Sequence, residues 1–114
     1  KERAVDMINI KLMKSGGILK ARKIVAIAES ANIPCMIGCM SESNVGVTAG
    51  VHLAAALKNV RFADLDSDLL IADKLVSRGG AKLKESKRVP STKPGLGITQ
   101  LNKKLLGKPL RVYE

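Results

Sequence analysis

The sequence predicts an α/β fold in which parallel strands alternate with helices, followed by a tail of a different kind. Three short apolar segments, at residues 5–10, 35–37 and 60–63, have the length of strands and are too brief for buried helices. Two longer segments, 18–31 and 45–57, are predicted to be helices and lie between them. Short connections in such an alternation favour right-handed crossovers and a parallel sheet.

The first strand and helix are separated by Gly16-Gly17, which interrupts the apolar run before a helical pattern begins. From residue 18 to 31, apolar side chains recur at helical spacing and charged side chains occupy the other faces. Asn32-Ile33-Pro34 is expected to end this amphipathic helix. The next strand is then Cys35-Met36-Ile37, and residues 38–43 form a loop.

The third part of the alternation consists of a helix at 45–57, built from small apolar residues that allow close packing on a sheet, and a strand at 60–63. From residue 77 onward the pattern changes. Gly79-Gly80 predicts a turn, and residues 83–89 alternate weakly, which is typical of one exposed strand. Residues 90–97 are expected to form a rigid loop, and 100–106 a short helix.

Lys11 is the first candidate catalytic residue, because it lies at the C-terminal end of the first strand, just before the glycine loop. Enzymes built on α/β barrels carry their catalytic groups at this end of the strands. An ordinary lysine is a poor base at neutral pH and must be desolvated or placed beside other cations. Lys14 is the weaker candidate, and two solvated lysines are the alternative interpretation.

Asp64 and Asp66 are a second candidate site, directly after the third strand. If the strand continues through them, their i, i+2 spacing places both carboxylates on one side of the sheet. Two negative charges at this separation require a cation. The alternative is an ordinary acidic turn at the surface, over residues 64–68.

Four motifs appear in a fixed order along the chain: Lys11, Gly38-Cys39-Met40-Ser41-Glu42-Ser43, Asp64-Leu65-Asp66 and Pro94-Gly95-Leu96-Gly97. Together they resemble the C-terminal part of the enolase superfamily, and most of all the dipeptide epimerases of the L-Ala-D/L-Glu type. The resemblance implies a partial (β/α)8 TIM-type barrel, with its last three βα units in residues 1–76. Residues 77–114 would then be a tail that returns to the capping domain. Because a closed barrel typically needs about 250 residues, the 114 residues are expected to be a piece of a longer enzyme.

The resemblance also implies a function, namely a Mg²⁺-dependent isomerase that epimerises dipeptides. Such an enzyme inverts the α-carbon of the C-terminal residue by proton transfer between two lysines, through an enediolate. Lys11 would be one base, whereas the second lysine and the acidic Mg²⁺ ligands would lie on upstream strands. Cys39 and Ser41 would contact the dipeptide, and Asp64 and Asp66 would bind its free ammonium group. No metal ligand is assigned within this chain, which is expected to be inactive alone, and the parent enzyme is expected to be a homo-oligomer.

Two alternatives remain open at this point. A muconate cycloisomerase or o-succinylbenzoate synthase would share Lys11 but would not need Asp64 and Asp66, because its substrates carry no ammonium group. A non-enzymatic basic binding or assembly module is the other alternative, since the net charge is +10. One Tyr and one Phe provide no aromatic platform for bases, so nucleic acid is not an expected partner.

The cysteines and the hydropathy give further expectations. Cys35 and Cys39 are four residues apart and the single histidine, His52, lies in another element, so the three form no recognised zinc motif. Free thiols agree with a cytoplasmic location. No apolar stretch has the length of a membrane-spanning helix, so no membrane partner is expected.

Overall fold

The computed structural model describes residues 4–107 of the chain. Residues 1–3 and 108–114, at the outer ends of the two predicted domains, lie outside the described part. In chain order the elements are β1 (Ile8–Lys11), α1 (Leu12–Ser15), α2 (Ile18–Ser30), β2 (Cys35–Gly38), α3 (Asn44–Ala56), β3 (Val60–Asp64), the 3₁₀ turn η1 (Ser67–Leu69), β4 (Val76–Gly79), β5 (Lys82–Lys84), β6 (Lys87–Val89), β7 (Ile98–Leu101) and the 3₁₀ turn η2 (Lys103–Leu105).

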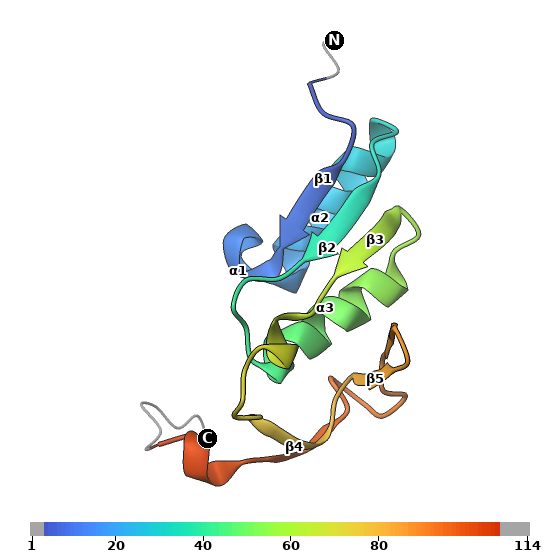
Figure 1. Ribbon diagram of the computed structural model, residues 1–114. Helices are drawn as coiled ribbons and strands as arrows, with labels where there is room; N and C mark the ends of the chain where they lie inside the picture. The colour runs from blue at the N-terminus through green and yellow to red at the C-terminus, as the bar shows by residue number, and fades with distance from the viewer. Residues whose placement is uncertain (1–3, 108–114) are drawn as a thin grey trace, which may run out of the picture.

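The centre of the molecule is a three-stranded parallel sheet in the order β1-β2-β3. Figure 1 shows these strands side by side, with α2 and α3 on one face of the sheet. This confirms the predicted alternation of strands and helices. Both helices and the second and third strands begin and end within one residue of the prediction, whereas the first strand covers Ile8–Lys11 and not residues 5–10. The short helix α1 was not predicted, because its four residues occupy the segment expected to be a loop.

The core lies between this sheet and the two long helices. Ile10, Cys35 and Ile37 point from the strands towards the helices, with 2%, 0% and 0% of their surface exposed. The α2 residues that meet them recur at helical spacing, as predicted, and are Ala21, Val25 and Ala28. The α3 residues buried with them are Val47, Thr48, Gly50, Val51 and Leu53. Apolar burial on this one face is the main force that holds the helices to the sheet.

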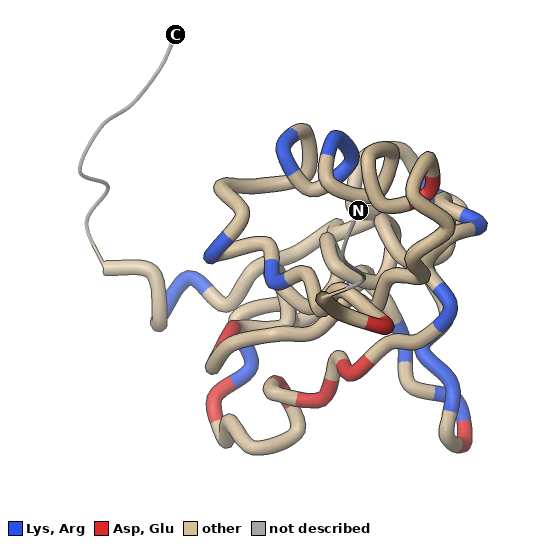
Figure 2. The backbone as a smooth tube through the Cα atoms, turned by 90° about the horizontal axis from the view of Figure 1, so that it is seen from above, with Lys and Arg blue, Asp and Glu red and all other residues tan. Residues whose placement is uncertain are grey.

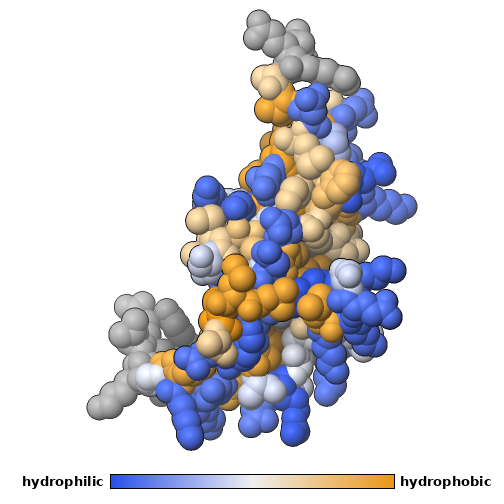
Figure 3. Space-filling view, viewed as in Figure 1, coloured by the Kyte–Doolittle hydropathy of each residue, from blue (hydrophilic) through white to orange (hydrophobic). Residues whose placement is uncertain are grey.

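The opposite face of the sheet is not covered by any described element (Figure 1). Because side chains alternate between the faces of a strand, this face carries every second residue of each strand. These residues are Asn9 and Lys11 on β1, Met36 and Gly38 on β2, and Phe62 and Asp64 on β3. Phe62 is 56% exposed, although it is the single phenylalanine of the chain. In Figure 3, seen from the same side as Figure 1, apolar and polar side chains mix over this part of the surface.

The tail differs from its prediction in two places. Residues 83–89 form a two-stranded hairpin, β5 and β6, and not one exposed strand. The chain reverses where Glu85 takes a left-handed backbone conformation with φ 53°, which the alternating pattern did not reveal. The predicted helix at 100–106 is also wrong, because Ile98–Leu101 pairs as strand β7 with β4, and only Lys103–Leu105 forms a 3₁₀ turn.

The Nε2 of His52, on α3, is buried without a hydrogen-bond partner among the described residues. Within residues 4–107, none of the helices combines the length and the hydropathy needed to cross a bilayer.

Candidate substrate site at the strand ends

Lys11, Gly38 and Asp64 form one row across the sheet. Lys11 pairs with Gly38 in the β1–β2 register, and Gly38 pairs with Asp64 in the β2–β3 register. All three occupy the last position of their strands, on the uncovered face. Because neighbouring strands lie about 4.8 Å apart, the Cα atoms of Lys11 and Asp64 are separated by roughly 10 Å. An amine and a carboxylate thus flank a position that has no side chain.

Asn9 lies beside this row, and the sequence did not predict that it belongs to the site. A Cβ atom on Gly38 would lie 2.6 Å from the Oδ1 of Asn9, so the amide leans over the glycine. Asn9 precedes Lys11 by two residues on the same strand and therefore shares its face. The i, i+2 spacing of Asn9 and Lys11 indicates that the two residues share a face of the strand. Only the strand pairing shows that Asn9 lies beside Gly38.

The backbone after Lys11 explains why the lysine stays at the strand end. Lys11 keeps an extended conformation, with φ −116° and ψ 123°, and the next residue begins α1. Gly16 ends this short helix with φ 80°, and the amides of Gly16 and Gly17 both donate to the carbonyl of Leu12. Lys11 is half-buried, whereas Lys14 lies on α1 and is exposed. Only Lys11 therefore belongs to the row.

The loop that carries Cys39 and Ser41 is organised by Glu42. This glutamate is 7% exposed, and its Oε1 accepts a hydrogen bond of 3.0 Å from the Met40 amide. Gly46, on the first turn of α3, makes room for it, because a Cβ there would lie 2.5 Å from the Oε2 of Glu42. Glu42 thus fixes the loop between β2 and α3 from inside.

The same loop is bonded to the segment after β3. The Oγ of Ser67 accepts from the Glu42 amide at 3.2 Å and donates to the Glu42 carbonyl at 3.1 Å. The thiol of Cys39 donates to the Oδ1 of Asp66 at 3.7 Å. The structure therefore brings Cys39 and Asp66 into contact. Ser41 is exposed in the same loop, and none of the hydrogen bonds among the described residues joins it to another predicted site residue.

Asp64 and Asp66 are held on either side of a buried residue. β3 ends at Asp64, and Leu65 is 6% exposed while both aspartates are exposed. Residues 64–73 contain four of the ten acidic residues of the chain. In Figure 2 the basic positions are spread over several sides of the backbone, and several acidic positions follow one another along one loop. This loop is therefore locally acidic, although the chain as a whole has a net charge of +10.

The described residues do not fit a metal centre. Among residues 4–107, no group of three or more histidine, cysteine, aspartate or glutamate side chains is placed to hold a metal ion. Asp64 and Asp66 give two carboxylates at most, whereas Mg²⁺ prefers octahedral coordination by oxygen. These residues alone therefore do not provide a magnesium site.

The two cysteines are free thiols in different surroundings. Cys35 is fully buried in the core, and burial, assisted by the negative charge of Glu29, raises the pKa of its thiol above the ordinary value. Cys39 is half-buried at the candidate site. Only Cys39 is placed to meet a ligand at the strand ends.

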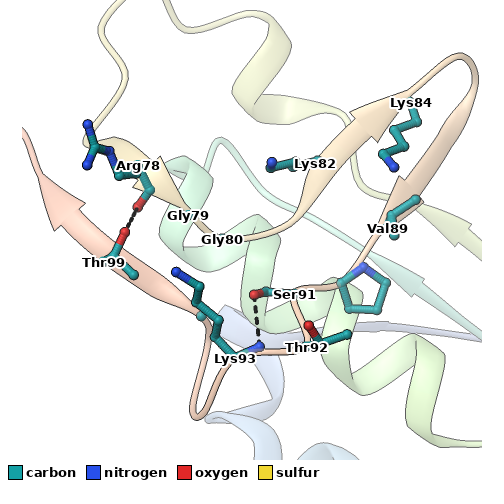
Figure 4. Close-up of a pocket in the computed structure, with 12 residues that line it drawn as sticks. Arg78, Gly79, Gly80, Lys82, Lys84, Val89, Ser91, Thr92, Lys93 and Thr99 are labelled. Carbon is teal, nitrogen blue, oxygen red and sulfur yellow. Dashed lines mark hydrogen bonds between the residues drawn. The ribbon is translucent and has the colours of Figure 1, made fainter.

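A separate hollow of about 360 Å³ lies in the tail, between the β4–β7 pair and the β5–β6 hairpin. Figure 4 shows Lys82, Lys84 and Lys93 around it, with Thr99 donating to the carbonyl of Arg78 at 3.3 Å. None of the predicted site residues lines this hollow. It is thus distinct from the candidate site at the strand ends.

Parallel βα units with polar groups at the C-terminal strand ends are typical of α/β proteins, to which the barrel-forming enzymes belong. A family model described as "Enolase C-terminal domain-like" matches residues 1–104, and the chain belongs to this family. The match confirms the resemblance inferred from the four motifs. It also confirms the predicted fold class, α/β with part of a TIM-type barrel.

Individual relatives agree with this assignment. The L-Ala-D/L-Glu epimerase of Clostridium acetobutylicum is 52% identical over 101 residues, which cover 88% of this chain and 28% of that protein. The solved structure of a substrate-liganded L-Ala-D/L-Glu epimerase from Bacillus subtilis matches with a TM-score of 0.84 and 42% identity, covering 88% of this chain and 28% of that one. A dipeptide epimerase from Enterococcus faecalis, complexed with Mg and L-Leu-L-Tyr, matches with a TM-score of 0.77 and 50% identity, covering 84% and 27%. The chain thus spans little more than a quarter of the relatives' length.

Proposed function

We propose that this chain supplies the catalytic strand ends of one side of a Mg²⁺-dependent dipeptide epimerase. The observation that carries the proposal is the row of Lys11, Gly38 and Asp64, which places an amine and a carboxylate on opposite sides of a glycine. A dipeptide has an α-proton to be removed and a free ammonium group to be bound. The row offers one group for each.

In this proposal Lys11 removes the α-proton on one face of the substrate, or returns it there. Inversion requires a second base on the other face, which is assigned to a part of the enzyme outside this chain. Asp64 and Asp66 bind the ammonium group of the first residue, and the loop of Cys39 and Ser41 contacts the rest of the dipeptide. Mg²⁺ is likewise assigned to ligands outside this chain, because the described residues do not provide them.

The test uses a fused enzyme, in which this chain is joined to the part of the Clostridium acetobutylicum epimerase that its match leaves out. Asp64→Asn and Asp66→Asn are each assayed with a dipeptide and with its N-acetyl analogue. A hydrogen bond to a charged group contributes about 1.5–3 kcal/mol, so each change should lower kcat/KM for the dipeptide by roughly 10- to 150-fold. The N-acetyl analogue has no ammonium group and should be affected far less. Equal losses for both substrates would reject the ammonium site.

The same enzyme separates the proposal from its alternatives. A muconate cycloisomerase or o-succinylbenzoate synthase would not lose activity on its own substrates when Asp64 and Asp66 are neutralised. A basic binding module would bind polyanions with an affinity that falls steeply as salt is added. A fused enzyme that folds but does not epimerise any dipeptide would contradict the proposed function.

A further inference from the structure

Arg88, on β6 of the tail hairpin, contacts the segment that carries the two aspartates. Its Nε donates a hydrogen bond of 3.0 Å to the carbonyl of Leu65. Its Nη1 donates to the Oδ2 of Asp68 at 3.2 Å, and its Nη2 forms an ion pair with the Oδ1 of the same residue. One side chain thus holds the segment at two points, which are 23 and 20 residues away in the sequence.

The bond to Leu65 constrains the Asp-x-Asp motif directly. Leu65 is the middle residue of Asp64-Leu65-Asp66, and its carbonyl lies in the rigid peptide plane that leads to Asp66. Fixing that carbonyl fixes the orientation of the plane, and hence the direction in which Asp66 leaves the strand end. A planar guanidinium suits this task, because its donors have a fixed geometry.

The contacts are also shielded from water. The side chains of Arg88 and Asp68 are 15% and 11% exposed. A hydrogen-bonded pair with so little solvent contact is weakly screened, and removing one partner leaves the other charge buried and unpaired. Between the two held points, Ser67 is bonded to Glu42. The segment from Leu65 to Asp68 is therefore fixed from the tail and from the neighbouring loop.

We infer that Arg88 is a positioning residue for the substrate-ammonium site, which it acts on through Leu65 and Asp68. The inference rests on the proposed function, in which Asp64 and Asp66 bind the ammonium group of the substrate. Arg88 is assigned the task of holding these two aspartates in the geometry that binding requires. It also makes the tail hairpin part of the site's support, a role that none of the four sequence motifs contains.

The test compares Arg88→Ala, Arg88→Lys and the control Lys87→Ala in the fused enzyme. Lys87 is the preceding residue of the same strand, and it is exposed. Because misplacement of a binding group by about 1 Å can cost on the order of 100-fold, Arg88→Ala should raise KM for a dipeptide by about 10- to 100-fold, with a smaller change in kcat. Arg88→Lys should fail to restore it, since one ammonium group cannot reproduce the three contacts. Lys87→Ala should behave like the parent.

Three readouts separate positioning from general support of the fold. The Arg88→Ala variant should lose little activity on the N-acetyl analogue. Added guanidinium ion should partly restore the KM of this variant for the dipeptide. Equal losses on both substrates, or a similar loss in Lys87→Ala, would overturn the inference. The third readout needs no activity: in the chain itself, Arg88→Ala should shift the backbone resonances of residues 65–70 and speed exchange of the Leu69 amide, which donates to the Asp66 carbonyl at 2.8 Å. If these resonances did not change, the inference would be wrong, whether or not the fused enzyme is active. An inactive fused enzyme by itself would reject only the proposed function.

Discussion

Gly50→Ala should destabilise the protein, although alanine is the better helix former. Gly50 lies on the buried face of α3, and a Cβ there would lie 2.8 Å from the Cδ2 and 3.4 Å from the Cδ1 of Leu65. Leu65 is 6% exposed, so a displaced methyl group must push against other core atoms. Gly50 is therefore the residue of α3 that leaves space for the side chain of Leu65, which lies between the two aspartates.

The expected change in the free energy of unfolding is the difference between two opposing effects. Glycine to alanine within a helix contributes about 1 kcal/mol of stability, and overpacking a core costs about 1–3 kcal/mol. The net change for Gly50→Ala is then a loss of about 0–2 kcal/mol. Leu65→Ala alone should cost about 2–5 kcal/mol, because it leaves a cavity. In the Leu65→Ala background the clash is gone, and Gly50→Ala should stabilise by about 1 kcal/mol.

The assay is urea unfolding of the four proteins of this double-mutant cycle, the parent and three variants, monitored by circular dichroism. The effect of Gly50→Ala should differ between the two backgrounds by about 1–3 kcal/mol. A stabilisation of about 1 kcal/mol in both backgrounds would refute the reasoning, since it would mean that Leu65 does not limit the space at Gly50.

The other predictions concern the lysines and the thiols. In the fused enzyme Lys11→Ala should abolish epimerisation and Lys14→Ala should retain most of it, and the reverse ranking would show that the wrong lysine was chosen. The chain alone should give no turnover of dipeptides, and measurable turnover would contradict the proposed division of the site. Alkylation followed by mass spectrometry should label Cys39 well before Cys35, because Cys35 is buried and its thiol pKa is raised. The raised pKa means that the unfolded chain releases this proton first, so the contribution to stability is complete below the ordinary thiol pKa and is lost as pH rises through the folded-state pKa. Cys35→Ala should lack this alkaline loss, and equal pH profiles of the unfolding free energy would contradict the assignment.

The barrel-type part of the fold was predictable because its signals are local. The spacing of Ala21, Val25 and Ala28 fixes the buried face of α2, and the apolar run before Lys11 fixes a strand and its end. The tail was less predictable because its pairing is not local. β4 pairs with β7 across about twenty residues, so the extended state of Ile98–Leu101 depends on a partner that its own pattern does not reveal.

The candidate site was predictable as a set of residues but not as an arrangement. Asp64 and Asp66 are visible as a spaced pair, whereas the row that joins Lys11 to Asp64 exists only through the two strand registers. The roles of Asn9 and Arg88 are likewise set by contacts with segments distant in the sequence. Their residue types alone are ordinary for a strand and for a basic hairpin.

The strand order β1-β2-β3 follows the order of the chain, so β2 and β3 each pair with a strand that has already been made. As the polypeptide is synthesised, the sheet can therefore grow at one edge, and no strand must be inserted between two earlier ones. Asp68 leaves the ribosome twenty residues ahead of Arg88. Completion of the sheet and completion of the strand-end site are thus separate events, and the site is expected to mature last, when the hairpin arrives.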